Sequence, residues 1–141
     1  MSLATWKKKY YPVDAAVVLE EDALDHSYRK WNGLKPKALL EHDLRVSDSE
    51  LVERGDIDGV LERLEITSET CALCVHHLDE SCPIKNQCRS CPVCVHRGGT
   101  PCDKELPDES ISPYNAFVRN GDPVPMIRIL KSLVRKQKNG Q

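Results

Sequence analysis

Aromatic residues are scarce in this sequence: they make up 5% of its 141 positions and include one phenylalanine. Large rings supply much of the buried area in a hydrophobic core, so this scarcity predicts a modest core that benefits from an additional staple. Apolar runs of membrane-spanning length are also missing, as is an apolar stretch behind the lysines of residues 1–11 that would indicate an export signal. We therefore expect a cytoplasmic protein without a membrane segment.

Neither the net charge nor the motifs favour the common catalytic and polyanion-binding classes. The formal net charge is −2, which does not suit attraction to nucleic acid by bulk charge. The H-E-x-x-H, P-loop, glycine-rich dinucleotide and zinc-deaminase patterns do not occur, so we expect a protein that is not an enzyme. The charge is uneven, with 15 acidic and 7 basic residues in 14–69 but one acidic and 5 basic residues in 121–141.

Cysteine is the residue type that the sequence concentrates most strongly, because all 7 cysteines lie in residues 71–102. The segment Cys71–His76 (CALCVH) nearly repeats as Cys91–His96 (CPVCVH). Each C-x-x-C pair forms a knuckle that directs two sulfurs at one point, and the x16 separation of the two pairs is typical of a structural zinc site. An odd number of cysteines without an export signal favours metal over disulfides.

Six of the seven cysteines are candidate metal ligands, and Cys82 lies outside the best spacing. The six are Cys71, Cys74, Cys88, Cys91, Cys94 and Cys102. His76, His77 and His96 each follow a C-x-x-C pair closely, and a histidine could complete a second site with Cys82 and Cys102. For each histidine alone we expect solvent exposure.

An iron–sulfur cluster is the alternative cofactor. Cys88, Cys91 and Cys94 have the spacing of the first three ligands in a ferredoxin-type run. The fourth ligand of such a run follows after three residues and precedes proline, whereas here the next cysteine is Cys102, which precedes Asp103. A dithiol redox site fits less well, because the chain before Cys71 has helical rather than β-α-β periodicity.

The apolar periodicity predicts a small, mostly α fold. We expect an N-terminal arm over residues 1–13 and a single helical domain over residues 14–141. This domain contains a zinc-stapled, cysteine-rich loop module over residues 68–105 and an amphipathic C-terminal helix over residues 124–138, which closes the core.

Capping and breaking residues predict where the shorter helices lie. Gly33 is a typical stop for a helix that precedes it, and Ser47–Glu50 has the form of a capping box. The first expected helix begins at Ala15 after the cap Asp14. Three more are expected over Asp22–Asn32, Lys37–Leu44 and Asp58–Leu64. Leu39, Leu40 and Leu44 are expected on the buried side of the Lys37–Leu44 helix.

Basic residues gather at the two ends of the chain. Lys7, Lys8 and Lys9 are flanked by Trp6, Tyr10 and Tyr11, a mixture that can contact phosphates and stacked bases. The stripe of Arg128, Lys131, Arg135 and Lys138 recurs at helical spacing beside the apolar side formed by Met126, Ile127, Leu130, Leu133 and Val134. A solvated helix face is the default interpretation, and a nucleic-acid surface is the alternative.

Several short motifs occur in a fixed order along the chain: Trp6 with Tyr11-Pro12-Val13, then Ala23–Ser27 and Lys30–Leu34, then Cys71–Cys74, Cys88–Val93, and Cys102 with Ser112-Pro113-Tyr114. Their order resembles a loose group of small cysteine-rich proteins of tailed bacteriophages, some of which look like zinc-binding proteins. The resemblance implies that Cys71, Cys74, Cys88, Cys91 and Cys102 form the shared set, with Cys82 and Cys94 as additions. Cys91 would then pair with Cys88 or Cys102 rather than with Cys94.

The resemblance implies no established activity, so two function classes stay open. In the first, the protein is a zinc-binding regulator or inhibitor that contacts a host or phage protein in the host-cell cytoplasm through its acidic first half. In the second, it binds nucleic acid through Lys7–Lys9 and the basic stripe, with a steep salt dependence.

Overall fold

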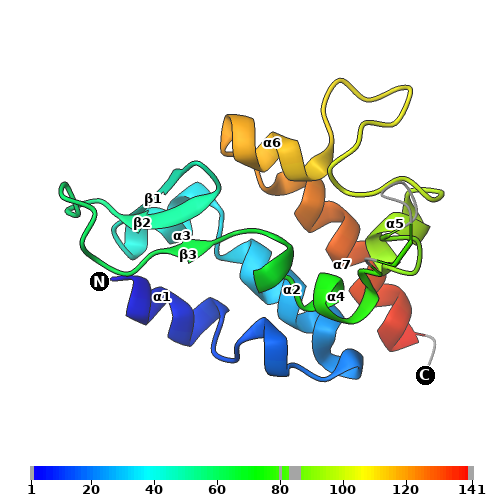
Figure 1. Cartoon of the computed structure of the whole chain (residues 1–141), viewed down its shortest axis with the longest axis horizontal. Coiled ribbons are helices and arrows are strands. Elements are labelled where there is room, and N and C mark those ends of the chain that lie inside the picture. Colours follow the sequence, from blue (N-terminus) through cyan, green and yellow to red (C-terminus); the bar gives the residue numbers. More distant parts are fainter. Residues whose placement is uncertain (1, 80, 83–86, 140–141) are drawn as a thin grey trace.

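The computed structural model describes residues 2–79, 81–82 and 87–139 of the chain. Helices dominate these residues, and a small three-stranded sheet lies at one end of the molecule (Figure 1). The α-helices are α1 (Leu3–Tyr10), α2 (Ala23–Asn32), α3 (Pro36–Glu41), α4 (Ala72–His77), α5 (Pro92–His96), α6 (Pro113–Asn120) and α7 (Val124–Asn139). Three-residue 3₁₀ helices are η1 (Ala15–Val17), η2 (Glu20–Asp22) and η3 (Ser68–Thr70), and the strands are β1 (Leu44–Ser47), β2 (Glu50–Glu53) and β3 (Leu64–Glu65). The predicted mostly α class is confirmed.

Helix α2 is the central element, because it packs against α7 on one side and α4 on the other. Leu24 and Trp31 are buried on its inner face, and the Trp31 ring meets Phe117 edge-on at 5.2 Å between centroids. The predicted boundaries are confirmed to within a residue, with Gly33 as the C-cap. A Cβ at Gly33 would collide with the side chain of Tyr10, so this close approach of α1 excludes a side chain there.

Residues 3–10 form helix α1 rather than an extended arm. Ser2 and Thr5 make a reciprocal capping box that starts the helix, and Leu3 and Trp6 are buried. The Trp6 indole N–H donates a 2.7 Å hydrogen bond to the carbonyl oxygen of Gly33, which fixes α1 against the end of α2. The aromatic ring of Trp6 is therefore part of the core and is not available for base stacking.

The segment predicted to hold a capping box at residues 47–50 is instead a β-hairpin. Ser47 pairs with Glu50, and the two loop residues Asp48 and Ser49 have φ values of 48° and 68°. Two left-handed residues match the right-handed twist of an antiparallel pair, which explains why the turn wins over a helix start. Leu44 is fully buried as predicted, but it begins β1 and does not end a helix.

Three other local predictions are wrong. Residues 15–17 form only the 3₁₀ turn η1, and Leu40 on α3 is 59% exposed rather than buried. The expected helix over residues 58–64 is a loop that leads into β3 at Leu64, and the Asp56 carboxylate accepts hydrogen bonds from the amides of Val60 and Leu61 in it. The Asp56 carboxylate satisfies two backbone amides that carbonyl oxygens would satisfy in a helical turn. The segment can therefore form a loop without regular secondary structure.

Helix α7 closes the core as predicted. Met126, Leu130 and Val134 are buried along one side, and Leu133 is partly buried beside them. Arg128, Lys131, Arg135 and Lys138 are all exposed on the other side. Among the described residues, no helix is long and apolar enough to cross a membrane.

Candidate metal centre

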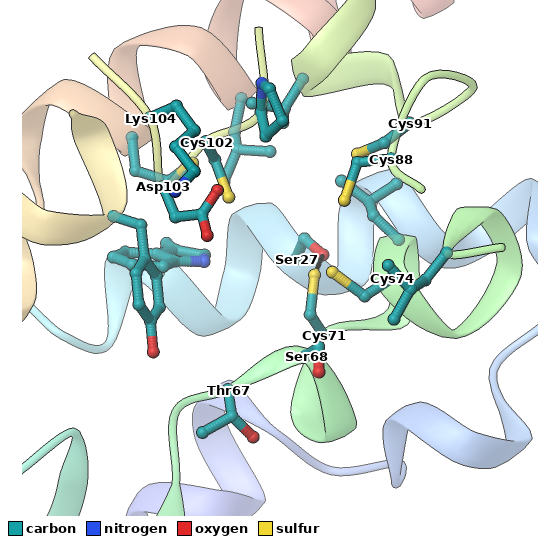
Figure 2. Close-up of a pocket in the computed structure, with 18 of the residues that line it drawn as sticks. Ser27, Thr67, Ser68, Cys71, Cys74, Cys88, Cys91, Cys102, Asp103 and Lys104 are labelled. Atoms are coloured by element: carbon teal, nitrogen blue, oxygen red, sulfur yellow. Dashed lines mark hydrogen bonds between the residues drawn. The ribbon is translucent and has the colours of Figure 1, made fainter. Parts of the chain in front are cut away.

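Five cysteines line one partly open cavity of about 960 Å³ between α2, α4, α7 and the loop that precedes α6 (Figure 2). They are Cys71, Cys74, Cys88, Cys91 and Cys102. The other lining residues include the apolar Trp31, Ile66, Leu73, Val93, Met126 and Leu130 and several polar ones, among them Ser27, Lys30 and Asp103. Figure 2 shows Cys71 and Cys74 on one side of the cavity, Cys88 and Cys91 on a second, and Cys102 on a third.

Two short helices position the first cysteine of each C-x-x-C repeat in the same way. Cys71 is the N-cap of α4 and Cys91 is the N-cap of α5, and their carbonyls accept hydrogen bonds from Val75 and Val95 at 3.0 and 2.9 Å. Proline at the first position of α5 suits this arrangement, because its missing N–H has no partner there in any helix. The repeat seen in the sequence is thus a repeat in local structure.

The second pair that faces the cavity is Cys88 with Cys91 and not Cys91 with Cys94. The amide of Cys91 donates a 2.9 Å hydrogen bond to the carbonyl of Cys88, which closes a tight turn between the two. Cys94 is buried in the core and is not among the described residues that line the cavity. Cys82 also lies outside it, and its thiol donates to the Asp79 carboxylate.

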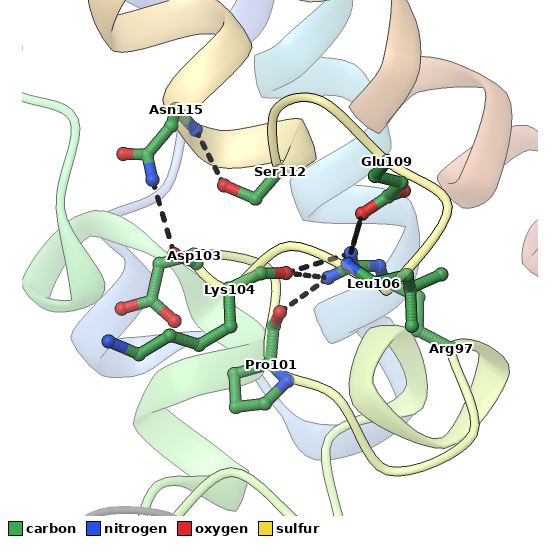
Figure 3. A network of polar contacts seen from close by, with 8 residues as sticks. All are labelled: Arg97, Pro101, Asp103, Lys104, Leu106, Glu109, Ser112 and Asn115. Atoms are coloured by element: carbon green, nitrogen blue, oxygen red, sulfur yellow. Dashed lines mark hydrogen bonds and ion pairs between the residues drawn. The ribbon is translucent and has the colours of Figure 1, made fainter.

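Cys102 reaches the cavity from a loop that Arg97 holds in place (Figure 3). The buried Arg97 guanidinium donates to the carbonyl of Pro101 and, at 2.9 and 3.0 Å, to that of Lys104, and it pairs with the Glu109 carboxylate. These acceptors flank Cys102 on both sides. The amide of Tyr114, at the start of α6, donates a 3.0 Å bond to the Cys102 carbonyl itself.

The thiols differ in their readiness to lose a proton. A hydrogen bond between the Cys71 and Cys74 side chains lowers the pKa of Cys71 and raises the pKa of Cys74. Burial raises the pKa of Cys91 to about 11 and also raises the pKa of Cys88 and of Cys102. A metal that binds these thiolates must therefore displace protons, which makes its binding pH-dependent.

Lys30 and Ser27 bring polar groups from α2 to the same cavity. The Lys30 side chain is buried with 1% exposure, and its ammonium donates a 3.0 Å hydrogen bond to the carbonyl of Thr70, the residue before Cys71. The Ser27 hydroxyl lies 3.9 Å from the Cys71 sulfur. Burial lowers the pKa of Lys30, while negative charge on Cys71, Cys74 and Cys102 acts to raise it.

The three histidines near the cysteines do not line the cavity. His76 is exposed and its Nε2 lies 2.6 Å from the Val18 carbonyl oxygen, a distance at which the ring N–H donates. His77 contacts the Ser90 hydroxyl at 3.2 Å, and His96 is exposed. The potential metal donors that line the cavity are therefore the five thiols and the carboxylate of the exposed Asp103.

The spacing of the thiols determines which metal centre they could bind without moving. Four sulfurs around one zinc ion lie about 3.8 Å apart, given a zinc–sulfur distance of about 2.3 Å. Among the described residues, no three Cys, His, Asp or Glu side chains converge on one point in this way. The donor chemistry fits zinc or an iron–sulfur cluster, and one zinc ion would draw the sulfurs of the separate sides inward.

The predicted basic residues are distributed over two separate helices. Lys8 and Lys9 on α1 are exposed, whereas Lys7 forms a 2.7 Å ion pair with Glu62. Helix α1 and the C-terminal half of α7 lie apart in Figure 1, with α2 between them. Lys7–Lys9 and the basic stripe of α7 thus do not form one continuous surface.

Sequence reasoning missed Ser27, Lys30 and Arg97. Ser27 and Lys30 occupy the buried face of α2 together with Leu24 and Trp31, and a polar residue on an apolar helix face is a signal that could have found them. Arg97 carried no such signal, because its role depends on a loop closed by residues up to 12 positions later.

Comparison of the chain with protein-family models, with curated proteins and with solved structures gives no match.

Proposed function

We propose that this protein binds a metal centre through thiolates in the cysteine-lined cavity, and that the centre staples the domain. Cys71, Cys74 and Cys91 are the core of the ligand set, and Cys88 and Cys102 supply the rest. The observation that carries the proposal is the convergence on one cavity of five cysteines from three segments of the chain.

The cavity itself supports an occupant. The cavity is partly open, and its volume of about 960 Å³ lies within the range of pockets that hold a small ligand or cofactor. A bound metal centre would fill part of this space and connect α4, the Cys88–Cys91 turn and the Cys102 loop. For a chain with few large aromatic residues, this connection contributes folding free energy that the core alone supplies poorly.

Zinc is the metal that we propose first. Four thiolates around zinc make a closed structural site without redox chemistry, which suits a staple. Cys71 with Cys74 and Cys88 with Cys91 provide two x2 pairs, and Cys102 lies on the third side of the same cavity. The zinc site would use the Cys88–Cys91 turn in place of the Cys91–Cys94 repeat.

An iron–sulfur cluster is the second candidate, and the spread of the thiols favours it. A four-iron cluster takes one cysteine at each of its irons, so its ligands approach from different sides of a cavity rather than meeting at a point. The cysteines approach the cavity from different sides in this way: Cys71 and Cys74 from one, Cys88 and Cys91 from a second, and Cys102 from a third (Figure 2).

Metal analysis of protein purified without added metal and under anaerobic conditions tests both candidates. One or more zinc ions per colourless chain supports the zinc site, whereas iron with inorganic sulfide and visible charge-transfer absorbance supports the cluster. The proposed function fails if the folded protein contains neither and takes up neither on reconstitution. Cys82→Ser is the matched control, since its thiol lies outside the cavity.

We further propose that the stapled domain serves as a protein-binding module. The loop between β2 and β3 favours this, because Ile57 and Val60 expose 92% and 80% of their surface next to acidic residues. Exposed apolar side chains mark an interaction site when they form a contiguous patch, so the proposal requires that Ile57 and Val60 contact the partner together. Ile57→Ser with Val60→Ser should abolish a complex that the wild type forms, whereas Val17→Ser, at another exposed position, should not.

A further inference from the structure

Lys30 is an unusual residue for the interior of this domain. Its side chain is 1% exposed, it lies on the face of α2 that packs on α4, and it lines the cysteine-rich cavity. An ammonium buried among apolar groups is costly unless charge and hydrogen bonds compensate it. The buried ammonium of Lys30 therefore requires a counter-charge or hydrogen-bond acceptors from elements other than α2.

The protein chain compensates the buried charge of Lys30 only in part. Among the described residues, the ammonium has one hydrogen-bond acceptor, the neutral carbonyl of Thr70 at 3.0 Å, although it carries three N–H donors. The Trp31 ring lies 5.9 Å away and offers a weak cation–π contact. Asp103 and Lys104 at the edge of the cavity are exposed, and Lys30 forms no ion pair with a described carboxylate.

The cysteines that line the same cavity become negatively charged when they bind a metal as thiolates. Negative charge on Cys71, Cys74 and Cys102 acts to raise the pKa of Lys30, which favours its charged form. The Thr70 carbonyl that holds the ammonium belongs to the residue before Cys71, so the contact fixes Lys30 next to the start of α4. Ser27, one turn earlier on the same face of α2, places its hydroxyl 3.9 Å from the Cys71 sulfur.

We propose that Lys30 is the internal counter-cation of the metal centre, and that the cavity therefore takes an anionic, all-thiolate centre. This inference rests on the proposed function and narrows it. Four thiolates on a divalent ion, or on a four-iron cluster in its usual oxidised state, carry a net charge of about −2. Lys30 offsets part of that charge inside the protein, and the Ser27 hydroxyl adds a donor toward Cys71.

This assignment excludes a neutral site of two cysteines and two histidines, because such a centre would leave the ammonium without a counter-charge. The directions of the histidines agree, since His76 is engaged with the carbonyl of Val18 and His96 is exposed. Groups around a metal site that are not ligands themselves commonly set its affinity, and their removal costs about 10- to 100-fold.

The test compares Lys30→Met, which keeps an unbranched apolar stem without the ammonium, with Lys30→Arg, which keeps the charge. Zinc affinity is measured by chelator competition, and stability is measured by urea unfolding of the metal-free and the zinc-loaded protein. We expect Lys30→Met to weaken zinc binding about 10- to 100-fold and to leave the metal-free protein as stable as wild type or more so. Lys30→Arg should stay within a few-fold of wild type, by retention of the charge.

A counter-cation and a lysine that stabilises the fold itself give different results in Lys30→Met. Loss of a counter-cation weakens zinc binding without lowering the stability of the metal-free protein, whereas loss of a structural lysine lowers that stability. If Lys30→Met binds zinc as tightly as wild type, the inference is wrong while the proposed function stands. If wild type binds neither zinc nor iron, the proposed function has failed as well. A Lys30→Met protein that fails to fold without metal, while metal-free Lys30→Arg folds, would also overturn the inference, because the ammonium would then stabilise the metal-free protein.

Discussion

The backbone amide of Tyr114 donates a 3.0 Å hydrogen bond to the carbonyl of Cys102, and its hydroxyl donates a 2.6 Å bond to the carbonyl of Ile66. The first contact holds the loop that brings in Cys102, and the second holds the strand end that leads to Cys71. One residue at the start of α6 therefore connects two sides of the cavity before any metal is considered. The positions of Cys71 and Cys102 in the cavity depend on these two contacts.

Cys71→Ser should damage the protein more than Cys82→Ser. Cys71 lines the cavity at the N-cap of α4, whereas Cys82 lies outside it and contacts Asp79. Loss of a structural ligand should lower the free energy of unfolding by roughly 3 kcal/mol or more, because site formation and folding are coupled. Soluble yield, metal content and urea unfolding of the two variants give the measurement, and equal values for both would contradict the site.

Arg97→Met should loosen the loop of Cys102. The buried guanidinium binds the carbonyls of Pro101 and Lys104, which flank Cys102, and the carboxylate of Glu109. Its removal takes the charged donor from all three, although the amides of Lys104 and Leu106 still donate to Pro101 and Glu109. We expect a loss of about 2–3 kcal/mol of stability together with weaker metal binding. Arg119→Met, at an exposed position of α6, is the matched control and should behave as wild type in both assays.

Acid should destabilise the protein partly through His26. Burial lowers the pKa of His26 from its ordinary 6.5, and its Nδ1 is buried without a hydrogen-bond partner among the described residues. The unfolded chain therefore takes up a proton below pH 6.5 that the folded chain resists, so stability falls as the pH drops from that value toward the folded pKa. His26→Gln should lose less stability than wild type between pH 7 and pH 5.5, and parallel pH profiles would contradict this origin.

Leu130→Asp should unfold the core around α7. Leu130 is 1% exposed and also lines the cavity, so an aspartate there would be buried without a counter-charge. The expected loss is on the order of 4 kcal/mol. Gln137→Asp on the exposed side of the same helix should change stability by less than about 0.5 kcal/mol. Thermal unfolding of both variants tests whether this side of α7 is buried.

The basic stripe of α7 should behave as a solvated face. Replacement of Arg128, Lys131, Arg135 and Lys138 by Gln should leave stability nearly unchanged, because exposed charges each contribute little. Wild type and the quadruple variant should bind DNA and RNA equally weakly at low salt. A clear loss of binding with a flatter salt dependence in the variant would instead establish the nucleic-acid function.

Helical periodicity predicted the parts of the fold that have long, regular apolar faces. The boundaries of α2 and the buried side of α7 were predicted correctly, because Leu24 and Trp31 or Leu130 and Val134 recur at the helical period. Short elements were not predictable in this way. The S-x-x-E pattern at residues 47–50 suits a helix cap and a hairpin equally, and the left-handed turn at Asp48 and Ser49 decided between them.

The cysteine stretch was predicted as a candidate metal site, but its grouping was not. Cys88, Cys91 and Cys94 have identical spacing, so local sequence offers no means of choosing between the two possible pairs. The choice arises from tertiary structure, since α5 places Cys94 in the core while the turn before it places Cys88 at the cavity. Lys30 could be suspected from its place on the apolar face of α2, but its partner, the carbonyl of Thr70 at the end of η3, comes from tertiary structure as well.

Removal of metal is the most direct test of a thiolate centre that staples this domain. Protein as purified and protein after treatment with a strong chelator under reducing conditions are compared by thermal unfolding and by the rate at which the cavity thiols react with an alkylating reagent. The account predicts that chelation lowers the melting temperature by more than about 10 °C and exposes Cys71, Cys74 and Cys91 to alkylation. An unchanged melting temperature, with the same thiols reacting at the same rate before and after chelation, would contradict it.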